Sequence, residues 1–250
     1  MTGAKGQTTA LVTGATSGIG AAIAHRLASS DIHVLVCGRD HDRGHSVVNS
    51  IRESGGRADF IHADLGGAAA AARQLATRAT TLAGRQVDVL VNNAAIGTVA
   101  PTPGFSEDAF DAMIATNLKA PFYLVGALAP AMAAHGAGAI VNISSIAGQL
   151  GLPGMSVYGA TKAALMLLTR SWAAEFGPKG VRVNSVVVGP TRTPGSADLG
   201  DALDQLAAQA PAGRVAQSDE IASAVGYLVS DSASFIHGAT LAVDGGRTAV

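Results

Sequence analysis

The sequence predicts an α/β protein built on a single doubly wound parallel β-sheet of about seven strands, with helices on both faces. Short apolar runs alternate along the 250 residues with longer segments of helical periodicity. Several of these runs are continuously apolar, which is typical of parallel strands that are covered on both faces. The composition does not shift along the chain, and no repeat or linker interrupts it, so we expect residues 1–250 to form one domain.

Seven apolar segments are the predicted strands of this sheet. They are residues 10–13, 34–37, 60–61, 87–91, 139–143, 181–186 and 240–243. The predicted helices between them cover residues 18–29, 41–54, 67–83, 107–134, 156–176 and 218–230. Residues 1–8 precede the first strand, and we expect them to be a flexible N-terminus.

One segment, residues 194–213, does not follow the alternation of strands and helices. Leu199, Leu203 and Leu206 recur there at helical spacing, which predicts a short inserted helix. A helix at the carboxyl end of a strand can be a lid over a ligand crevice. An ordinary connecting helix packed on the core is the alternative, and both interpretations remain open.

The composition argues against several classes of protein. Hydrophobic residues make up 48% and charged residues 14%, and the formal net charge is −1 without a run of Lys or Arg. Nucleic acid and anionic membranes are therefore not expected as partners. No apolar stretch approaches the ~20 residues that span a bilayer, and residues 1–9 lack a hydrophobic signal region. The lone cysteine, Cys37, fits a small apolar strand residue in a reducing cytoplasm.

A glycine-rich turn, Thr13 to Gly20, directly follows the first predicted strand and opens a helix. Glycines in this place let the backbone approach a pyrophosphate, and the helix N-terminus supplies unpaired N–H groups. A turn with glycines for geometry alone is the alternative, but the position after the first strand favours a dinucleotide site. No Gly-Lys-Ser/Thr follows, so a nucleoside-triphosphate loop is not indicated.

Tyr158 and Lys162 lie four residues apart at the start of a predicted helix. Side chains at this spacing share a helix face, so the ammonium can lie beside the phenol. A fixed cation lowers the pKa of a tyrosine from about 10 and makes it a usable proton donor or acceptor. The pair alone is compatible with a solvated helix face, but the glycine turn, an asparagine and a serine elsewhere favour catalysis.

Together with Asn92-Asn93-Ala94, Asn117 and Ser145, these motifs resemble the short-chain dehydrogenase/reductase family in its ~250-residue form. The resemblance extends from Leu11 to Gly246, and Thr13 to Gly20 matches the family's Thr-Gly-x-x-x-Gly-x-Gly turn in full. It implies a Rossmann-type fold and a tail typical of a homotetramer. The chain departs from the family pattern where Ala95 replaces a glycine and where Val188 and Ser218 replace prolines.

The resemblance also implies an active site of four residues, Asn117, Ser145, Tyr158 and Lys162. Ser144 is the alternative serine, but neighbouring strand residues face opposite ways, and Ser145 has the family's spacing of thirteen residues to Tyr158. Tyr158 is expected to transfer the proton, Ser145 to bond the substrate oxygen, and Asn117 to hold a relay water. Lys162 is expected to lower the pKa of Tyr158 and to bind the nicotinamide ribose.

The resemblance carries over further residues that are expected to bind the cofactor. In addition to Tyr158 and Lys162 they are Gly14, Thr16, Ser17, Gly18, Ile19, Gly20, Arg39, Asp64, Leu65, Asn93, Ala94, Thr191 and Thr193. Thr191 by its backbone and Thr193 by its hydroxyl are the expected contacts of the nicotinamide amide.

The end of the second strand predicts NADP(H) rather than NAD(H). Gly38 stands where NAD-preferring relatives place an acidic residue, and a guanidinium at Arg39 suits a 2′-phosphate. Arg43 is expected to assist. Asp40 would become the NAD-type acid if the alignment slipped by two residues, but the apolar run ends at Cys37, which places Asp40 beyond the strand.

The sequence therefore predicts an NADP(H)-dependent oxidoreductase that acts on a carbonyl or secondary alcohol, with similarity to 3-oxoacyl-acyl-carrier-protein reductases. A dinucleotide-binding sensor or scaffold without turnover is the alternative. Mostly small or apolar residues at 96–98, 149–155 and 198–206 are expected to line the substrate pocket. His41 and His45 are four apart, but no third ligand accompanies them, so we expect a solvated helix face and no metal.

Overall fold

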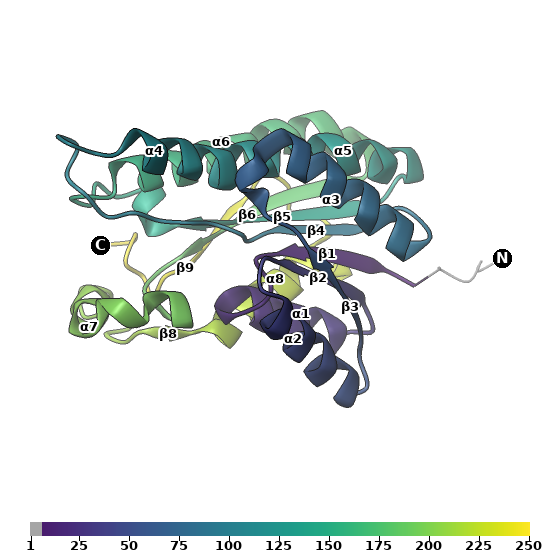
Figure 1. Cartoon of the computed structure of the whole chain (residues 1–250), viewed down its shortest axis with the longest axis horizontal. Helices are drawn as coiled ribbons and strands as arrows, with labels where there is room; N and C mark the ends of the chain where they lie inside the picture. Colours follow the sequence, from purple (N-terminus) through teal and green to yellow (C-terminus); the bar gives the residue numbers. More distant parts are fainter. Residues whose placement is uncertain (1–6) are drawn as a thin grey trace.

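The computed structural model describes residues 7–250. They form three layers, in which one parallel sheet lies between two layers of helices (Figure 1). The seven strands run in the order β3-β2-β1-β4-β5-β6-β9. Their bounds are β1 Thr9–Thr13, β2 His33–Gly38, β3 Arg57–His62, β4 Val89–Asn92, β5 Gly138–Ser145, β6 Val181–Val188 and β9 Thr240–Val243. The predicted fold class is confirmed. Residues 1–6 of the expected flexible N-terminus lie outside the described residues.

The strand order reverses between β1 and β4, which pair in parallel with Ala10 opposite Val89. The chain builds β1 to β3 outward on one side and then crosses to β4 on the other side. In open α/β sheets the crevice at such a reversal, beyond the carboxyl ends of the strands, is where ligands bind.

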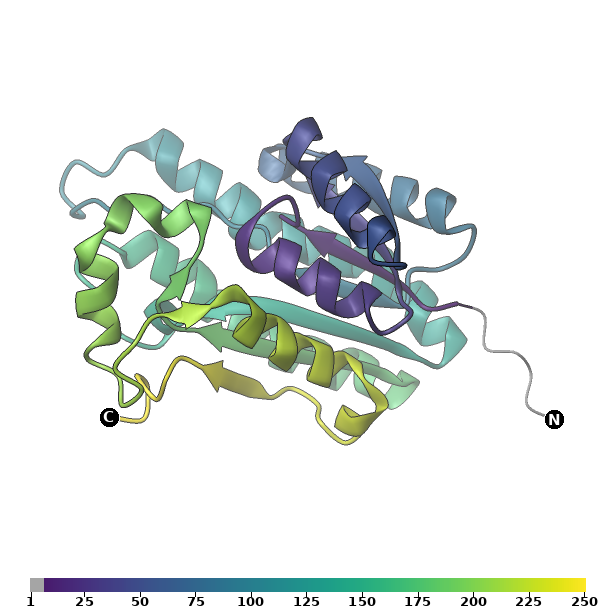
Figure 2. The ribbon, with the colours of Figure 1, turned by 90° about the horizontal axis from the view of Figure 1, so that it is seen from below.

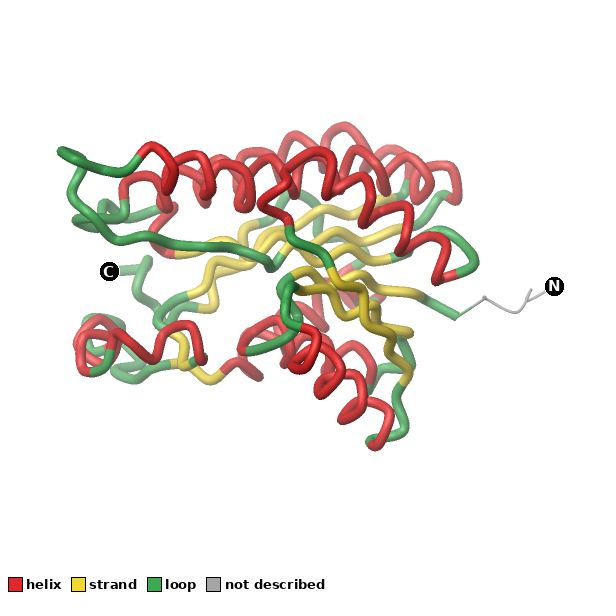
Figure 3. The backbone as a smooth tube through the Cα atoms, in the orientation of Figure 1, coloured by secondary structure: helices red, strands yellow, loops and turns green. Residues whose placement is uncertain are grey.

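Helices cover both faces of the sheet (Figure 3). The first face carries α1 Gly18–Ala28, α2 His41–Glu53 and α8 Ser218–Val229. The second face carries α3 Ala68–Ala83, α4 Glu107–Ile114, α5 Ala120–His135 and α6 Ser156–Phe176, as Figure 1 shows. The six predicted helices are present, and their ends differ from the expected ones by at most one residue at each terminus.

The strand residues supply two separate cores because successive side chains point to opposite faces. Val12 and Val36 belong to the core under α1 and α8. Leu11 and Leu35 belong to the core under α3, α5 and α6. Burying each such side chain contributes about 1.5–3 kcal/mol. Cys37 is buried in this second core, and burial raises the pKa of its thiol to about 12, which agrees with a purely apolar role.

The helix expected at 107–134 contains a π-helical turn, Ala115–Lys119, between α4 and α5. The periodicity of apolar residues did not reveal this turn. From Glu107 to His135 the segment has an 18-residue window of mean hydropathy 1.2 and is long enough to cross a bilayer. The expectation that no stretch reaches that length was therefore wrong. Leu124, Leu128 and Met132 of this helix are buried against the sheet, as in the core helix of a globular fold.

The segment between β6 and α8 departs from the alternation of strands and helices and contains a short inserted helix, as the leucine spacing predicts. It begins with β7 Thr191–Arg192, continues through a 3₁₀ helix, Pro194–Leu199, and α7 Asp201–Ala207, and returns as β8 Ala216–Gln217. β7 and β8 pair in parallel as a separate small ribbon. Figure 2 shows the segment as a flap beside the C-terminal end of the chain.

Candidate active site

A cavity of about 790 Å³ opens at the carboxyl ends of the strands. The glycine turn, the ends of β2, β4 and β5, the start of α6, and the segment around β7 and α7 line it. All the residues that the sequence predicts to bind the cofactor line this one cavity, as do Ser145, Tyr158 and Lys162. Asn117 is fully buried behind the wall, where its neighbour Thr116 lines the cavity instead.

The glycine turn needs its glycines for space as well as for conformation. Gly14 and Gly18 have φ angles of 63° and 53°, which side chains rarely adopt. A Cβ atom on Gly14 would lie 2.8 Å from the Cα atom of Ala94, and one on Gly20 would collide with the carbonyl oxygen of Gly14. The backbone of the glycine turn therefore packs closely against Ala94 in the cavity wall, and the first turn of α1 faces the cavity.

The N-terminus of α1 is suited to an anion. Its N-cap residue Ser17 has an extended backbone and makes no side-chain cap hydrogen bond within the described residues. The N–H groups of the first helical turn are thus left for a ligand, and the helix dipole favours a negative charge there. These features fit the pyrophosphate of a dinucleotide.

Thr13 and Asn93 fasten the glycine turn to β4. The Thr13 hydroxyl donates to the Val91 carbonyl oxygen at 3.2 Å and accepts from the Asn93 and Ala94 N–H groups at 3.0 and 3.1 Å. The Asn93 amide donates to the carbonyl oxygens of Thr13 and Gly14 at 2.9 and 3.0 Å. Asn93 was expected to contact the cofactor. It lines the cavity, its amide nitrogen also holds the turn in place, and the cofactor contact stays a prediction.

Tyr158, Ser145 and Lys162 line the cavity together. Tyr158 and Lys162 come from the first turns of α6, and Ser145 is the last residue of β5. Ser144 faces the opposite way and donates its hydroxyl to the Lys162 carbonyl oxygen at 3.0 Å. Ser145 is the serine whose side chain lowers the pKa of Tyr158.

The electrostatics of this cluster differ from the expectation that Lys162 lowers the pKa of Tyr158. Burial raises the pKa of Tyr158 above its ordinary value, and the hydrogen bond from Ser145 offsets this rise only in part. Burial lowers the pKa of Lys162 to about 8. The Lys162 ammonium donates to the Ile143 carbonyl oxygen at 2.8 Å and lies 5.6 Å from the centre of the Tyr158 ring.

Asn117 lies in the π-helical turn and contacts the backbone that leads into the substrate end. Its side-chain oxygen accepts from the Ile96 N–H at 2.9 Å, and its nitrogen donates to the Ile96 carbonyl oxygen at 2.8 Å. The same nitrogen reaches the Thr161 hydroxyl at 3.3 Å. Because both ends of the amide are occupied, a water-holding role would fall to the Asn117 backbone.

Comparisons with known proteins agree with this geometry. A family model described as enoyl-(acyl carrier protein) reductase matches residues 14–248. A solved structure described as a short chain dehydrogenase/reductase family protein is 48% identical, with a TM-score of 0.89, and the match covers 97% of this chain and 98% of that chain. The chain belongs to the short-chain dehydrogenase/reductase family.

Relatives within this family act on several kinds of alcohol and carbonyl. Cis-4-hydroxycyclohexanecarboxylate dehydrogenase of Sinomonas cyclohexanicum is 41% identical, and cyclopentanol dehydrogenase of a Comamonas species is 37% identical, each over 96% of both chains. The 3-oxoacyl-[acyl-carrier-protein] reductase of Staphylococcus epidermidis is 36% identical over 95% of this chain and 97% of its own. The chain is thus an oxidoreductase of the family.

One solved relative of this short-chain dehydrogenase/reductase was crystallised with a cofactor. It is described as a putative NAD(P)-dependent gluconate 5-dehydrogenase from Beutenbergia cavernae with bound NADP at low occupancy. It is 40% identical, with a TM-score of 0.92, over 97% of each chain.

At the expected 2′-phosphate end of the dehydrogenase, Asp40 is committed to a structural role. Its carboxylate caps α2 by accepting from the Arg43 N–H at 2.9 Å and pairs with the Arg43 guanidinium at 2.9 Å. These contacts hold the pKa of Asp40 below its usual value. Arg39 is exposed on the cavity rim. A Cβ atom on Gly38 would collide with the Thr16 methyl group, so this enzyme cannot place an acid there without moving Thr16.

The segment 194–213 closes one side of the cavity in the enzyme. Leu199, Leu203 and Leu206 line the cavity, and Leu206 also packs on the core beside Ile146 and Met166. The expected pocket range 96–98 lines the cavity, whereas only Leu152 and Met155 do so within 149–155. The same helix thus touches the core and the cavity, and the role of the segment as a lid stays a prediction.

The exposed rings of His41 and His45 pack on neighbouring rings. His41 stacks on His62 at 4.3 Å between ring centres, and His45 lies 5.2 Å from the Phe60 ring centre.

Sequence reasoning missed two residues that shape the site of the dehydrogenase, namely Thr13 as the anchor of the glycine turn and Ser196. The spacing of Thr13 before the glycines was visible, but its partners in β4 were not.

Proposed function

We propose that this chain is an NADP(H)-dependent dehydrogenase/reductase that interconverts a compact, mainly apolar secondary alcohol and its ketone. The observation that carries the proposal is that Tyr158, Ser145 and Lys162 line one cavity together with the glycine turn, with the Lys162 nitrogen 5.6 Å from the Tyr158 ring centre. In this family the nicotinamide, when bound, supplies or accepts the hydride.

The remaining chemistry falls to residues of the chain. Tyr158 gives its hydroxyl proton to the substrate oxygen in reduction and takes it back in oxidation. Ser145, whose hydroxyl interacts with Tyr158 when no substrate is bound, turns its single proton to the substrate oxygen where negative charge develops. Lys162 holds ribose hydroxyls and draws the phenol toward its ionised form once it is protonated. The Asn117 backbone continues the proton path from Lys162.

Charge at the rim supports NADP(H) as the cofactor. The described residues that carry positive charge on the cavity wall are Arg39, Arg43 and Lys162. Asp40 neutralises Arg43, which leaves Arg39 as the principal partner for a 2′-phosphate. Thr16, Ser17 and the first turn of α1 would hold the pyrophosphate, Asp64 and Leu65 the adenine, and Thr191 and Thr193 the nicotinamide amide.

The walls beyond Tyr158 support an apolar substrate. They come from Ile96 to Val99, Leu152, Met155, Leu199, Leu203 and Leu206, with Asp198 as the one carboxylate. An anionic substrate would meet Asp198 without a cation to match it, so cyclic ketones fit better than sugar acids or other carboxylates. A 3-oxoacyl thioester, by resemblance to the acyl-carrier-protein reductases, is the second candidate because the same walls suit an acyl chain.

We also propose that the enzyme is a cytoplasmic homotetramer. The outer layer of α4, α5 and α6 exposes Phe110, Phe122 and Leu167, and the loop before β9 exposes Phe235 almost completely. Apolar surface of this kind on one chain supports burial against further copies.

The experiment follows NADPH absorbance with cyclopentanone, 4-oxocyclohexanecarboxylate and an acetoacetyl thioester as substrates. We expect the highest kcat/KM with cyclopentanone and the lowest with the carboxylate. Tight NADPH binding without turnover of any ketone or alcohol would instead support the sensor or scaffold. A clear preference for the thioester would select the second candidate.

A further inference from the structure

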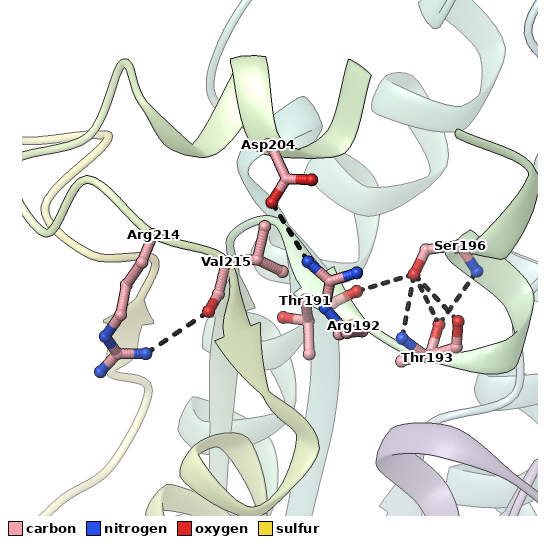
Figure 4. Close-up of polar contacts among 7 residues, drawn as sticks. All are labelled: Thr191, Arg192, Thr193, Ser196, Asp204, Arg214 and Val215. Carbon is pink, nitrogen blue, oxygen red and sulfur yellow. Dashed lines mark hydrogen bonds and ion pairs between the residues drawn. The ribbon is translucent and has the colours of Figure 1, made fainter. Parts of the chain in front are cut away.

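The hydroxyl of Ser196 lies at the centre of a small network beside the cavity (Figure 4). Ser196 stands in the 3₁₀ helix that follows β7. Its oxygen lies 2.9 Å from the Thr191 carbonyl oxygen, 3.1 Å from the Thr193 carbonyl oxygen, 2.9 Å from the Thr193 nitrogen and 3.2 Å from the Thr193 hydroxyl. Thr191, Thr193 and Ser196 all line the cavity.

Counting protons fixes the direction of each bond. A serine hydroxyl has one proton to donate and two lone pairs that accept. The Ser196 proton goes to a carbonyl oxygen, of which that of Thr191 is the nearer. The lone pairs accept from the Thr193 N–H and from the Thr193 hydroxyl. The Ser196 hydroxyl is therefore fully used.

The same count leaves the Thr193 hydroxyl as an acceptor. Its proton is donated to Ser196, and one of its lone pairs accepts from the Ser196 N–H at 3.1 Å. Its second lone pair is left to accept from a ligand N–H or O–H. Without Ser196 the Thr193 hydroxyl could rotate, and it would present a donor as readily as an acceptor.

Thr193 is placed to use that lone pair near the reacting centre. A Cβ atom on Gly18 would lie 3.1 Å from the Thr193 Cβ atom, so Thr193 sits over the start of α1. Tyr158 and Lys162 line the same cavity. A ligand that extends from the glycine turn to Tyr158 therefore lies in a space that Thr193 also lines.

We propose that Ser196 is a positioning residue that fixes the Thr193 hydroxyl as the acceptor for a primary amide of the bound ligand. The inference rests on the proposed function, in which that amide is the carboxamide of the nicotinamide. It also joins the amide contact to the flap, because Ser196 lies in that segment, where Arg192 pairs with Asp204 of α7 at 3.1 Å (Figure 4).

The test measures ligand dissociation constants by calorimetry for the full chain and its Ser196→Ala variant. The ligands are NADP⁺, its 3-acetylpyridine analogue, which has a methyl ketone in place of the amide, and 2′,5′-ADP, which lacks the nicotinamide. We expect Ser196→Ala to weaken NADP⁺ binding about tenfold, the scale of one hydrogen bond. Binding of the other two ligands should not change.

The matched control is Ser218→Ala. Ser218 bonds the Arg192 carbonyl oxygen of the same ribbon at 3.3 Å, outside the cavity lining, and its loss should leave all three constants unchanged. Ser196→Thr keeps a hydroxyl and should restore NADP⁺ binding. Thr193→Val repeats the test if Ser196→Ala is unstable, and it should weaken NADP⁺ alone.

Two results would overturn the inference while leaving the proposed function intact. One is unchanged NADP⁺ binding by Ser196→Ala, and the other is an equal loss for NADP⁺ and the acetylpyridine analogue, which indicates a merely structural role. Failure of the unmodified chain to bind both NADP⁺ and 2′,5′-ADP would overturn the proposed function and the inference together.

Discussion

The ammonium nitrogen of Lys162 lies 5.6 Å from the ring centre of Tyr158, one helical turn earlier on α6. The pair is buried differently, because Lys162 is 3% exposed while Tyr158 is half-buried at the cavity wall. Burial disfavours the charged form of both groups, and the pKa of Lys162 falls to about 8 while that of Tyr158 rises. Without ligand, burial therefore moves both groups toward their neutral forms, although Lys162 stays mostly protonated at pH 7 because its pKa is about 8.

Replacing Lys162 with Met should change how the stability of the ligand-free protein depends on pH. The pKa of Lys162 is about 8 when folded and 10.5 by its ordinary value, so the folded state binds fewer protons between these values. The free energy of unfolding therefore rises with pH across that window and is lowest below about pH 8. The wild type should gain about 3 kcal/mol relative to Lys162→Met between pH 7 and 11. The free energies come from urea unfolding at each pH. If they depend on pH in the same way for the two proteins, the lowered pKa of Lys162 is refuted.

Replacing Arg39 with Ala should weaken NADPH binding by about 1.5–3 kcal/mol, the scale of a hydrogen bond to a charged group. NADH binding should be almost unchanged, because its ribose lacks the 2′-phosphate. Arg43→Ala is the matched control and should cost less, because Asp40 already pairs with Arg43. Fluorescence titration measures both cofactors, and equal losses for the two, or a wild-type preference for NADH, would show that Arg39 does not read the phosphate.

Gly38 and Thr16 should be energetically coupled. A Cβ atom on Gly38 would collide with the Thr16 side chain, so Gly38→Ala should destabilise the fold by about 1–3 kcal/mol. In the Thr16→Ala background most of that cost should disappear, because the colliding methyl and hydroxyl are gone. A double-mutant cycle by urea unfolding measures the coupling. Additive effects would mean that the two side chains do not share this space.

The protein should behave as a homo-oligomer at micromolar concentration, most simply a tetramer. Leu167 is 58% exposed on α6, and Phe122 of α5 is exposed as well. A charge at Leu167 should oppose burial against another copy. Leu167→Glu should lower the mass measured by light scattering, whereas Leu82→Glu at the end of α3 should not. A wild-type mass of only 24.8 kDa would rule out assembly.

The strands and helices were predictable because apolar periodicity and glycine punctuation are local signals. Two features of the site were not predictable from these local signals. The π-helical turn around Asn117 leaves no trace in that periodicity, because one extra residue in a turn barely changes which side chains are buried. The carbonyl of Ile143 as the partner of Lys162 depends on how β5 packs against α6.

The effect of burial on the pKa of Tyr158 could not be predicted from the sequence. The four-residue spacing correctly placed Lys162 on the same helix face, but it carries no information on the depth of either side chain. Asn93 shows the same limit, since its motif position did not reveal that its amide nitrogen bonds the glycine turn.

The central claim is that Tyr158 transfers the proton, and the Tyr158→Phe variant tests it most directly. The change removes a single hydroxyl from a half-buried ring, so folding and NADPH affinity should stay close to those of the wild type. Turnover of the best ketone, followed by NADPH absorbance, should fall by about 10²–10⁴-fold, the contribution of a positioned acid–base group. A variant that binds NADPH normally and keeps more than about a tenth of wild-type turnover would contradict the account.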